Sequence, residues 1–540
     1  MNDFFLGIDC STQSMKGILL DWPSLTLQNK IIINYDKDLS HYGTQNGVYI
    51  SKDGKKVHSN PLLWVEALDL LLEKLHNGNI PLHTIKALSG SAQQHGTVYL
   101  NDKFVSMLSN LNPNKSLTLQ LNGVFSREIS PVWMDSSTSK QCQEIRDALG
   151  GSESTIRRTG SNTFERFSGP QIRKFYQDTP KKYEDTAIIH LISSFLSSLF
   201  LGKSSPIDYG DGSGMNLMNI TNKCWDEKAI KATAPHLIQK LPKLVESDTI
   251  IGNIAPYYVK RYGFSPETKL LPWSGDNPNS LIGVGLVEPG QVAVSLGTSD
   301  TYFTPLQQLF LDLSGQSHVF GAPNGNYMAL ICFKNGSLAR ESIKNHFNLT
   351  WNEFSNILKL TPPGNLGRIM LPYFYPEIVP LVLAPRVYRF GFEEYDMNAN
   401  VRGIIEAQCL AIRIHSQWIN KAPVEIIATG GGSENREILQ VLSDVFQTPV
   451  KILNVLDSAA LGAALRSIQS FKAYNGEKLQ WSELIQLCKD LQPIEILTPR
   501  EDNKILYDQM MEIYQSYEQF ILQNGKDPDK KRLKFKEKYF

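Results

Sequence analysis

The stretch FFLGIDCSTQSMKGILLD, Phe4–Asp21, has the pattern of two apolar strands joined by the polar turn Cys10–Ser14. Such a turn presents backbone N–H groups and hydroxyls that can hold phosphate oxygens, and here Thr12 and Lys16 supply further donors. Asp9, at the end of the first strand, is placed to hold Mg²⁺ through water. On this segment alone, an ordinary hairpin with a polar turn is the simpler interpretation.

A second strand–turn–strand unit, VAVSLGTSDTYFT at Val292–Thr304, repeats this plan in the second half of the chain. Gly297 removes the side chain that would keep a phosphate from the backbone, and Thr298 adds a hydroxyl. Two such turns, one in each half, favour a nucleotide held between two domains. We expect an N-terminal domain at 1–288, a C-terminal domain at 289–500, and a C-terminal helix with a basic tail at 501–540.

A glycine-rich turn follows a third strand-like run. Val424–Thr429 is apolar, GGGSEN occupies Gly430–Asn435, and Arg436–Phe446 has the apolar spacing of an amphipathic helix. Glycines at a helix start let an anionic or flat group approach the backbone. The turn is neither GxGxxG nor a Walker loop. A tight strand–helix turn is the alternative interpretation.

Asp276 lies in WSGDNP, Trp273–Pro278, directly after an apolar run. One interpretation is a carboxylate that caps the following helix. The other is a general base, because in phosphoryl transfer a carboxylate orients the attacking hydroxyl and accepts its proton.

Two polar pairs in the first half, Gln94-His95 and Glu165-Arg166, are suited to bind a polyhydroxylated ligand. A sugar needs several donors and acceptors in fixed geometry, and these side chains provide them. A lone histidine is more often structural, so His95 alone would not support this reading. Asn101–Ser130 has little periodicity, and we expect an insertion or long surface loop there.

Composition excludes several classes of function. The chain has 540 residues with 54 Lys+Arg and 54 Asp+Glu, so no global charge attracts nucleic acid or an anionic membrane. The six cysteines form no CxxC pair, which suggests reduced thiols in a cytoplasmic protein. The opening residues do not have the pattern of a signal peptide, and no apolar run approaches the roughly 20 residues of a membrane span.

Four segments in this order resemble the FGGY family of carbohydrate kinases: Leu6–Ser14, Gly275–Pro278, Ser295–Ser299 and Ala428–Asn435. The resemblance runs from about Phe5 to Ala464. It implies two actin-like ATPase (RNase H-like) α/β domains with the active site in the cleft between them. It also implies ATP and Mg²⁺ as cofactors and a small-molecule sugar as substrate, with the N-terminal domain mainly binding sugar and the C-terminal domain mainly binding nucleotide.

Within the family, the chain is most similar to eukaryotic members that phosphorylate D-xylulose at its 5-hydroxyl. The segments that carry this similarity are Ser89–Gly96, Trp133–Asp135, Gly160–Gly169 and Asp208–Asn216. The resemblance assigns sugar contacts to His95, Arg166, Asp276 and Asn277, with Asp276 as base. It assigns nucleotide contacts to Trp351, Gly431, Gly432 and Asn435, beside the Thr12 and Thr298 of the two turns. Gly432 departs from the family pattern, in which another small residue is common, without affecting backbone contact.

Two alternatives stay open at this point. The same chemistry could act on ribulose, gluconate, glycerol or another polyol, because the ATP motifs are shared across the family. A non-enzymatic actin-like or chaperone-like protein would use the same nucleotide cleft but has no need of sugar-facing residues such as Asp276 and His95. The sequence leaves a monomer and a homodimer equally open.

Overall fold

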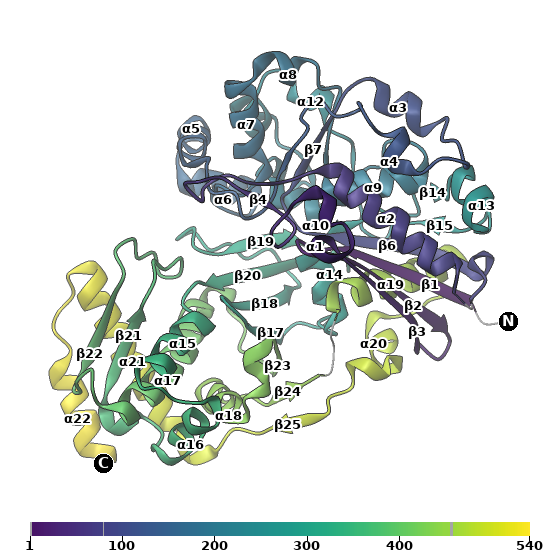
Figure 1. Cartoon of the computed structure of the whole chain (residues 1–540). Coiled ribbons are helices and arrows are strands. Elements are labelled where there is room, and N and C mark those ends of the chain that lie inside the picture. The colour runs from purple at the N-terminus through teal and green to yellow at the C-terminus, as the bar shows by residue number, and fades with distance from the viewer. Residues whose placement is uncertain (1–2, 79, 454–456) are drawn as a thin grey trace.

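A seven-stranded sheet forms the centre of each of two lobes in this computed structural model (Figure 1). The structure describes residues 3–78, 80–453 and 457–540. The first lobe is coloured purple to teal in Figure 1, and the second is mostly green to yellow. Two mixed sheets with helices packed around them confirm the predicted α/β class.

The first sheet is built from β1 (Asp3–Cys10), β2 (Ser14–Trp22), β3 (Leu27–Asn34), β6 (Ile85–Ala92), β14 (Gly252–Asn253), β15 (Lys269–Leu270) and β16 (Ser274–Gly275). Its order is β14-β15-β6-β1-β2-β3, and β16 pairs with β6. β1 runs antiparallel to β2 and parallel to β6. The predicted strand–turn–strand unit is therefore the β1–β2 hairpin at the middle of the sheet.

The second sheet is built from β17 (Gln291–Leu296), β18 (Asp300–Leu306), β19 (His318–Gly321), β20 (Tyr327–Phe333), β23 (Glu425–Thr429), β24 (Val450–Ile452) and β25 (Glu495–Leu497). Its order is β19-β20-β18-β17-β23-β24-β25. β17 is antiparallel to β18 and parallel to β23, as β1 is to β2 and β6. The repeat expected from sequence is thus present in the pairing of the strands.

Shorter strands form small sheets at the edges of the lobes. They are β4 (Tyr49–Ile50), β5 (Val57–Ser59) and β8 (Ser130–Pro131); β7 (Thr97–Leu100) and β9 (Ile188–Leu191); β10 (Ile207–Asp208) and β13 (Leu244–Val245); β11 (Met218–Asn219) and β12 (Cys224–Trp225); β21 (Ile369–Tyr373) and β22 (Arg386–Phe390).

The helices up to the second sheet are α1 (Tyr35–Asp38), α2 (Pro61–His76), α3 (Lys103–Leu108), α4 (Leu117–Gln120), α5 (Ser139–Leu149), α6 (Ser152–Thr159), α7 (Ser168–Asp178), α8 (Pro180–Glu184), α9 (Ile192–Leu201), α10 (Tyr209–Gly212), α11 (Glu227–Thr233), α12 (Leu237–Lys240), α13 (Pro256–Tyr262) and α14 (Asp276–Gly283). The later helices are α15 (Ser337–His346), α16 (Trp351–Leu360), α17 (Met397–His415), α18 (Arg436–Phe446), α19 (Ser458–Tyr474), α20 (Trp481–Leu487), α21 (Lys504–Gln523) and α22 (Asp529–Tyr539). In the part of the chain that the structure describes, none of them combines the length and hydropathy of a membrane span.

Two segments differ from the loops or tails expected from sequence. Asn101–Ser130 is no surface loop, because Phe104 and Leu117 on its short helices α3 and α4 are fully buried in the core of the first lobe. The basic C-terminal tail is the helix α22, whose Phe535 packs into the core of the second lobe. In both cases a few apolar side chains at isolated positions find partners that the local pattern does not reveal.

Helix α19 lies in sequence between β24 and β25 of the second sheet but packs on the first sheet. It contacts β1, β6 and, most extensively, α14. The predicted boundary at 288/289 lies between the two sheets, whereas α19 returns from the predicted C-terminal domain to the first lobe (Figure 1). The chain therefore passes between the lobes three times, the last time to form β25 of the second sheet.

Glycines allow this return. A Cβ added at Gly462 of α19 would lie 1.9 Å from the Asn279 carbonyl oxygen of α14, and one at Gly283 would lie 1.7 Å from the Ser458 carbonyl oxygen. A Cβ at Gly7 of β1 would lie 2.1 Å from the Ala460 carbonyl oxygen. The backbones of α14, α19 and β1 are therefore in direct contact, with no room for a methyl group between them.

We expect Gly462→Ala to destabilise the protein, because the new methyl group must push the backbones of α14 and α19 apart. Overpacking of this kind costs about 1–3 kcal/mol or more, which outweighs the roughly 1 kcal/mol gain in helix propensity. The midpoint of thermal unfolding should fall clearly.

The matched control is Gly403→Ala, also within a helix, where the new methyl group would meet nothing closer than the Asn365 side-chain amide at 3.3 Å. Its midpoint should stay near that of the unmodified protein. Equal stability of the two variants would contradict the backbone contact described for α14 and α19.

Candidate active site

The carboxyl ends of three neighbouring strands bring the sugar-side candidates together. Asp9 of β1 lies opposite Ser91 of β6, and Ser274 of β16 also pairs with Ser91. His95 follows β6 and Asp276 follows β16, so both lie beyond the strand ends at which Asp9 is found. This is the edge of an α/β sheet at which ligands usually bind.

Asp276 is the first residue of α14, and its side chain is half-buried. One carboxylate oxygen accepts hydrogen bonds from the Asn277 backbone N–H at 2.9 Å and from its side-chain amide at 3.1 Å. The Asn277 amide also donates to Gln94 Oε1 at 2.9 Å. Burial, and then the negative charge of Asp9, raise the pKa of Asp276 to about 7. This carboxylate can therefore take up or release a proton near neutral pH.

His95 is held with its backbone in the left-handed region, at φ 74°. Its Nδ1 lies 2.9 Å from the Gly214 carbonyl oxygen, so Nδ1 carries the proton and donates it there. Burial, and then the charge of Arg166, lower the pKa of His95 to about 3, so the ring is neutral at physiological pH. The remaining nitrogen, Nε2, is then a hydrogen-bond acceptor suited to a sugar hydroxyl.

Arg166 joins the two lobes. Its Nη2 donates to His318 Nε2 at 2.8 Å, and its guanidinium lies 5.3 Å from the ring centre of Phe164. His318 is on β19 of the second sheet, and burial lowers its pKa well below the usual value. A neutral His318 can accept from Arg166. The sequence contained no signal for His318, because nothing local marks it as a partner of a residue some 150 positions away.

Asp211 is a second residue that the sequence reasoning did not single out. One carboxylate oxygen accepts from Ser193, whereas the other has no partner among the described residues. A Cβ at Gly275 would lie 3.0 Å from that second oxygen, which places Asp211 beside the backbone leading to Asp276. Burial, followed by the charges of Asp208 and Asp276, raises the pKa of Asp211 well above its usual value. The dense polar and glycine run around it is the signal that could have found it.

Asp9 suits a cation held partly by water. Ser11 Oγ donates to its Oδ2, while Oδ1 is buried without a hydrogen-bond partner among the described residues. Burial raises its pKa. Over residues 3–78, 80–453 and 457–540, no three His, Cys, Asp or Glu side chains gather as a metal cage. A single carboxylate with a free oxygen fits Mg²⁺, which keeps several waters and is completed by substrate phosphates.

Lys16, which the sequence offered as a phosphate donor, is paired with a carboxylate in the structure. Its Nζ pairs with Asp457 at 2.9 Å, and Lys30 pairs with the other oxygen of the same carboxylate. Asp457 directly precedes α19. The two lysines therefore tie the hairpins of the first sheet to the returning helix.

A cavity of about 810 Å³ in the second lobe collects the nucleotide-side candidates. It is bounded by the β17–β18 turn, the first turns of α15 and α16, and the glycine-rich turn before α18. Thr298, Trp351, Gly431, Gly432 and Asn435 all line it. The strand pairing explains the meeting of two of these segments, since Ser295 of β17 lies opposite Thr429 of β23.

The three glycines of the turn have different surroundings. A Cβ at Gly430, whose φ is 81°, would lie 2.8 Å from the Leu296 carbonyl oxygen, and one at Gly432 would lie 2.8 Å from Leu296 Cβ. A Cβ at Gly431 would meet nothing within 4 Å. Gly430 and Gly432 therefore permit the tight packing of a strand–helix turn, and Gly431 leaves the backbone open to the cavity.

Asn435 and Trp351 complete the walls of this cavity. Asn435 caps α18 by accepting from the Glu437 and Ile438 backbone N–H groups, and its amide donates to Ser355 Oγ at 2.8 Å. Trp351 begins α16 and is 42% exposed, although a tryptophan, judged by residue type alone, would be expected in the core. An exposed indole at the edge of a cavity offers a flat face for an aromatic base.

Thr12 is the one nucleotide candidate that does not line this cavity. Its hydroxyl accepts from Trp133 Nε1 at 2.9 Å and lies 3.4 Å from Gln93 Oε1. It stands at the β1–β2 turn of the first lobe, on the same sheet edge as Asp9.

Both halves of the chain match family models, and a known protein matches it almost from end to end. Residues 128–283 match the FGGY family of carbohydrate kinases, N-terminal domain, and residues 292–469 match the C-terminal domain of that family. A protein of Rattus norvegicus named xylulose kinase is 41% identical over 534 residues, covering 97% of this chain and 98% of its own length.

Solved structures show the same fold at low sequence identity. A xylulose kinase from Rhodospirillum rubrum superposes with a TM-score of 0.80 at 18% identity, covering 95% of this chain and 98% of its own. A gluconate kinase from Lactobacillus acidophilus superposes with a TM-score of 0.79 at 20% identity, covering 95% of this chain and 97% of its own. With both halves matched by the family models, the chain belongs to the FGGY family of carbohydrate kinases.

Proposed function

We propose that this carbohydrate kinase transfers the γ-phosphoryl group of ATP to the 5-hydroxyl of D-xylulose, in the cytoplasm. The observation that carries the substrate is the 41% identity to a rat protein named xylulose kinase, over 98% of that protein. The fold alone does not identify the sugar, because a gluconate kinase structure superposes on this chain with a similar TM-score. The cytoplasmic location rests on the six cysteines, which are all free.

The sugar side would use the residues at the end of the first sheet. Neutral His95 supplies an acceptor at Nε2, and the Arg166 guanidinium supplies donors. The Asn277 amide, held between Asp276 and Gln94, supplies a further polar contact. A mixed set of fixed donors and acceptors is what discrimination between hydroxylated ligands needs.

Asp276 would act as the base. A pKa of about 7 leaves a substantial fraction of the carboxylate ionised at neutral pH while keeping it basic enough to accept the hydroxyl proton. The hydrogen bonds from Asn277 fix one carboxylate oxygen, and the other oxygen would receive the proton of the sugar hydroxyl. As the hydroxyl oxygen bonds to the γ-phosphorus, its proton passes to Asp276 and ADP leaves.

The nucleotide side would use the cavity of the second lobe. Trp351 offers a face for adenine, and the open backbone at Gly431 allows close approach of the nucleotide. Asp9 would hold Mg²⁺, which when bound offsets charge on the phosphates. Thr12 and Thr298, one in each hairpin turn, would donate to phosphate oxygens. Approach of the lobes would exclude water from the transferred group.

The substrate assignment predicts a ranking in a coupled assay of ATP consumption. D-xylulose should have the highest kcat/KM in a panel with D-ribulose, gluconate and glycerol. A higher kcat/KM for another compound of the panel would identify that compound, and not D-xylulose, as the substrate. ATP hydrolysis that no sugar stimulates would instead favour the non-enzymatic reading of the nucleotide cleft.

Asp276→Asn should lower kcat by about 10²–10⁴-fold, because the amide keeps the size of the side chain but cannot accept a proton. The affinity for ADP, measured by calorimetry, should stay unchanged, since Asp276 is not among the residues that line the nucleotide cavity. A kcat within tenfold of the unmodified enzyme would remove Asp276 from the role of base.

The pH dependence of the unmodified enzyme checks the same assignment. The base works in its ionised form, so kcat/KM for the sugar should decline as the pH is lowered through about 7. Above that pH it should level off. If kcat/KM did not change between about pH 5.5 and 8, the ionised form of Asp276 would not be required for catalysis.

Trp351→Ala should raise KM for ATP by about five- to hundredfold, because stacking of a base on an aromatic ring contributes about 1–3 kcal/mol. The kcat should change much less, since the ring is remote from the transferred phosphoryl group. Trp351→Phe, which keeps a flat face, should restore most of the affinity. An unchanged KM in the alanine variant would place adenine elsewhere.

A further inference from the structure

A second cavity, of about 310 Å³, lies in the first lobe between the short strand β5 and the helices α7 and α8. None of the proposed sugar or nucleotide residues lines it. Its volume is at the lower end of the range of small-molecule sites. Its lining residues are Lys56, His58, Arg127, Glu128, Ile129, Ser137, Gln171, Lys174, Phe175, Asp178, Thr179 and Lys182.

Positive charge exceeds negative charge around this cavity. Lys56, Arg127, Lys174 and Lys182 face only the two acidic lining residues Glu128 and Asp178. In the part of the chain that the structure describes, none of the four cations has a carboxylate oxygen within 4.0 Å. Every ion pair found there involves a different basic residue.

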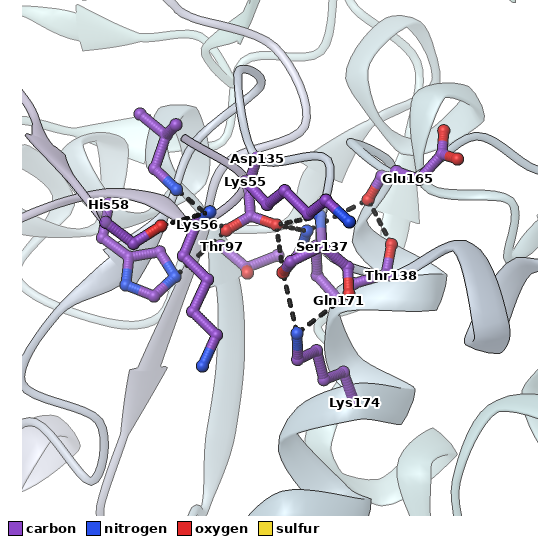
Figure 2. Close-up of polar contacts among 12 residues, drawn as sticks. Lys55, Lys56, His58, Thr97, Asp135, Ser137, Thr138, Glu165, Gln171 and Lys174 are labelled. Carbon is purple, nitrogen blue, oxygen red and sulfur yellow. Dashed lines mark hydrogen bonds and ion pairs between the residues drawn. The ribbon is translucent and has the colours of Figure 1, made fainter. Parts of the chain in front are cut away.

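The carboxylate beside the cavity is already fully engaged. Asp135, 1% exposed, accepts from the Val57 backbone N–H at 3.0 Å and lies 3.2 Å from His58 Nε2. Its other oxygen accepts from Ser137, through both backbone and hydroxyl, and from the Gln171 amide at 2.8 Å. Figure 2 shows Asp135 at the centre of these contacts, with the side chains of Lys56 and Lys174 both lying below it in the view. Asp135 thus has no free oxygen with which to pair either lysine.

Two of the four cations, Lys174 and Arg127, are held by neighbouring groups, whereas Lys56 and Lys182 are exposed. Lys174 Nζ donates to the Ser137 carbonyl oxygen at 2.9 Å and to its hydroxyl at 2.8 Å. The Arg127 guanidinium lies 5.1 Å from the ring centres of both Tyr99 and Phe175. Burial, and then the positive charge of Lys56, lower the pKa of Lys174. Neighbouring cations that repel one another are stabilised by an anion that bridges them.

We propose that this cavity, which we call the Lys174 cavity, binds a small phosphate-bearing anion at a site separate from the active site. A phosphate group presents several acceptor oxygens, which suits two ammonium groups and a planar guanidinium with many donors. The mixed lining, with Phe175 and Ile129 beside the cations, leaves room for the organic part of a phosphate monoester.

Calorimetry with inorganic phosphate tests the site directly, on the full-length protein with its active site saturated with ADP and the ionic strength held constant with NaCl. Saturable binding is expected in the millimolar range or tighter. The double variant Lys56→Met/Lys174→Met should weaken it by at least about tenfold, because hydrogen bonds to charged groups contribute about 1.5–3 kcal/mol each. Absence of saturable binding by the unmodified protein, or equal binding by the double variant, would overturn the proposal.

Lys181→Met is the matched control. Lys181 is exposed on α8 next to Lys182, but it does not line the cavity, so its loss should leave phosphate binding unchanged. An equal loss of affinity in this variant would reduce the effect to general surface charge and overturn the site.

Lys182→Met keeps the test available if the double variant does not fold, because the Lys182 side chain makes no hydrogen bond or ion pair within the described structure. It should weaken phosphate binding several-fold while the thermal midpoint stays unchanged. Full retention of affinity in this variant would count against the cavity. Glucose 6-phosphate in place of inorganic phosphate should bind to the unmodified protein and lose affinity in the same variants.

Discussion

The direct backbone contact between α14 and α19 is the constraint on which the active site depends. α14 begins with Asp276, so the position of the proposed base is set where this helix is held. It is held by a helix that follows six of the seven strands of the second sheet in the chain, and that also lies against β1, the strand that carries Asp9. Gly283 and Gly462 permit the approach, and Asp457 at the start of α19 pairs with Lys16 on β2. The distance between the carboxylates of Asp9 and Asp276 therefore depends on the packing of α19, a helix that is distant from both residues in sequence.

The features that could be predicted from sequence are those whose cause is local. Strand–turn–strand patterns identified both hairpins, and the run of three glycines identified the turn before α18. Once two parallel strands pair, their carboxyl ends must meet, which brings Thr298 close to the glycine-rich turn and Asp276 close to Asp9. The resemblance to the family added Trp351, whose exposure at the cavity no local pattern indicates.

The features that could not be predicted arise from contacts between distant segments. Arg166 donates a hydrogen bond to His318 of the other sheet, and the sequence around either residue gives no indication of this contact. Asp135 supports the Arg166 loop in a similar way: it binds the Gln171 amide, which also donates to the Glu165 carbonyl oxygen at 3.0 Å. Apolar residues scattered through Asn101–Ser130 looked like a loop because their partners lie in helices elsewhere in the first lobe.

The net charge of zero conceals two opposite local imbalances in the first lobe. At the active site, Asp9, Asp211 and Asp276 all have pKa values raised by burial, and the nearby Lys16 is engaged by Asp457. A nucleoside triphosphate placed there would add further negative charge, which the proposed Mg²⁺ and the turn amides would offset. Around the Lys174 cavity the excess is positive, because Asp135 is saturated by neutral donors and His58. A balanced composition thus excludes only long-range attraction, and it is compatible with an acidic cluster and a basic cavity within one lobe.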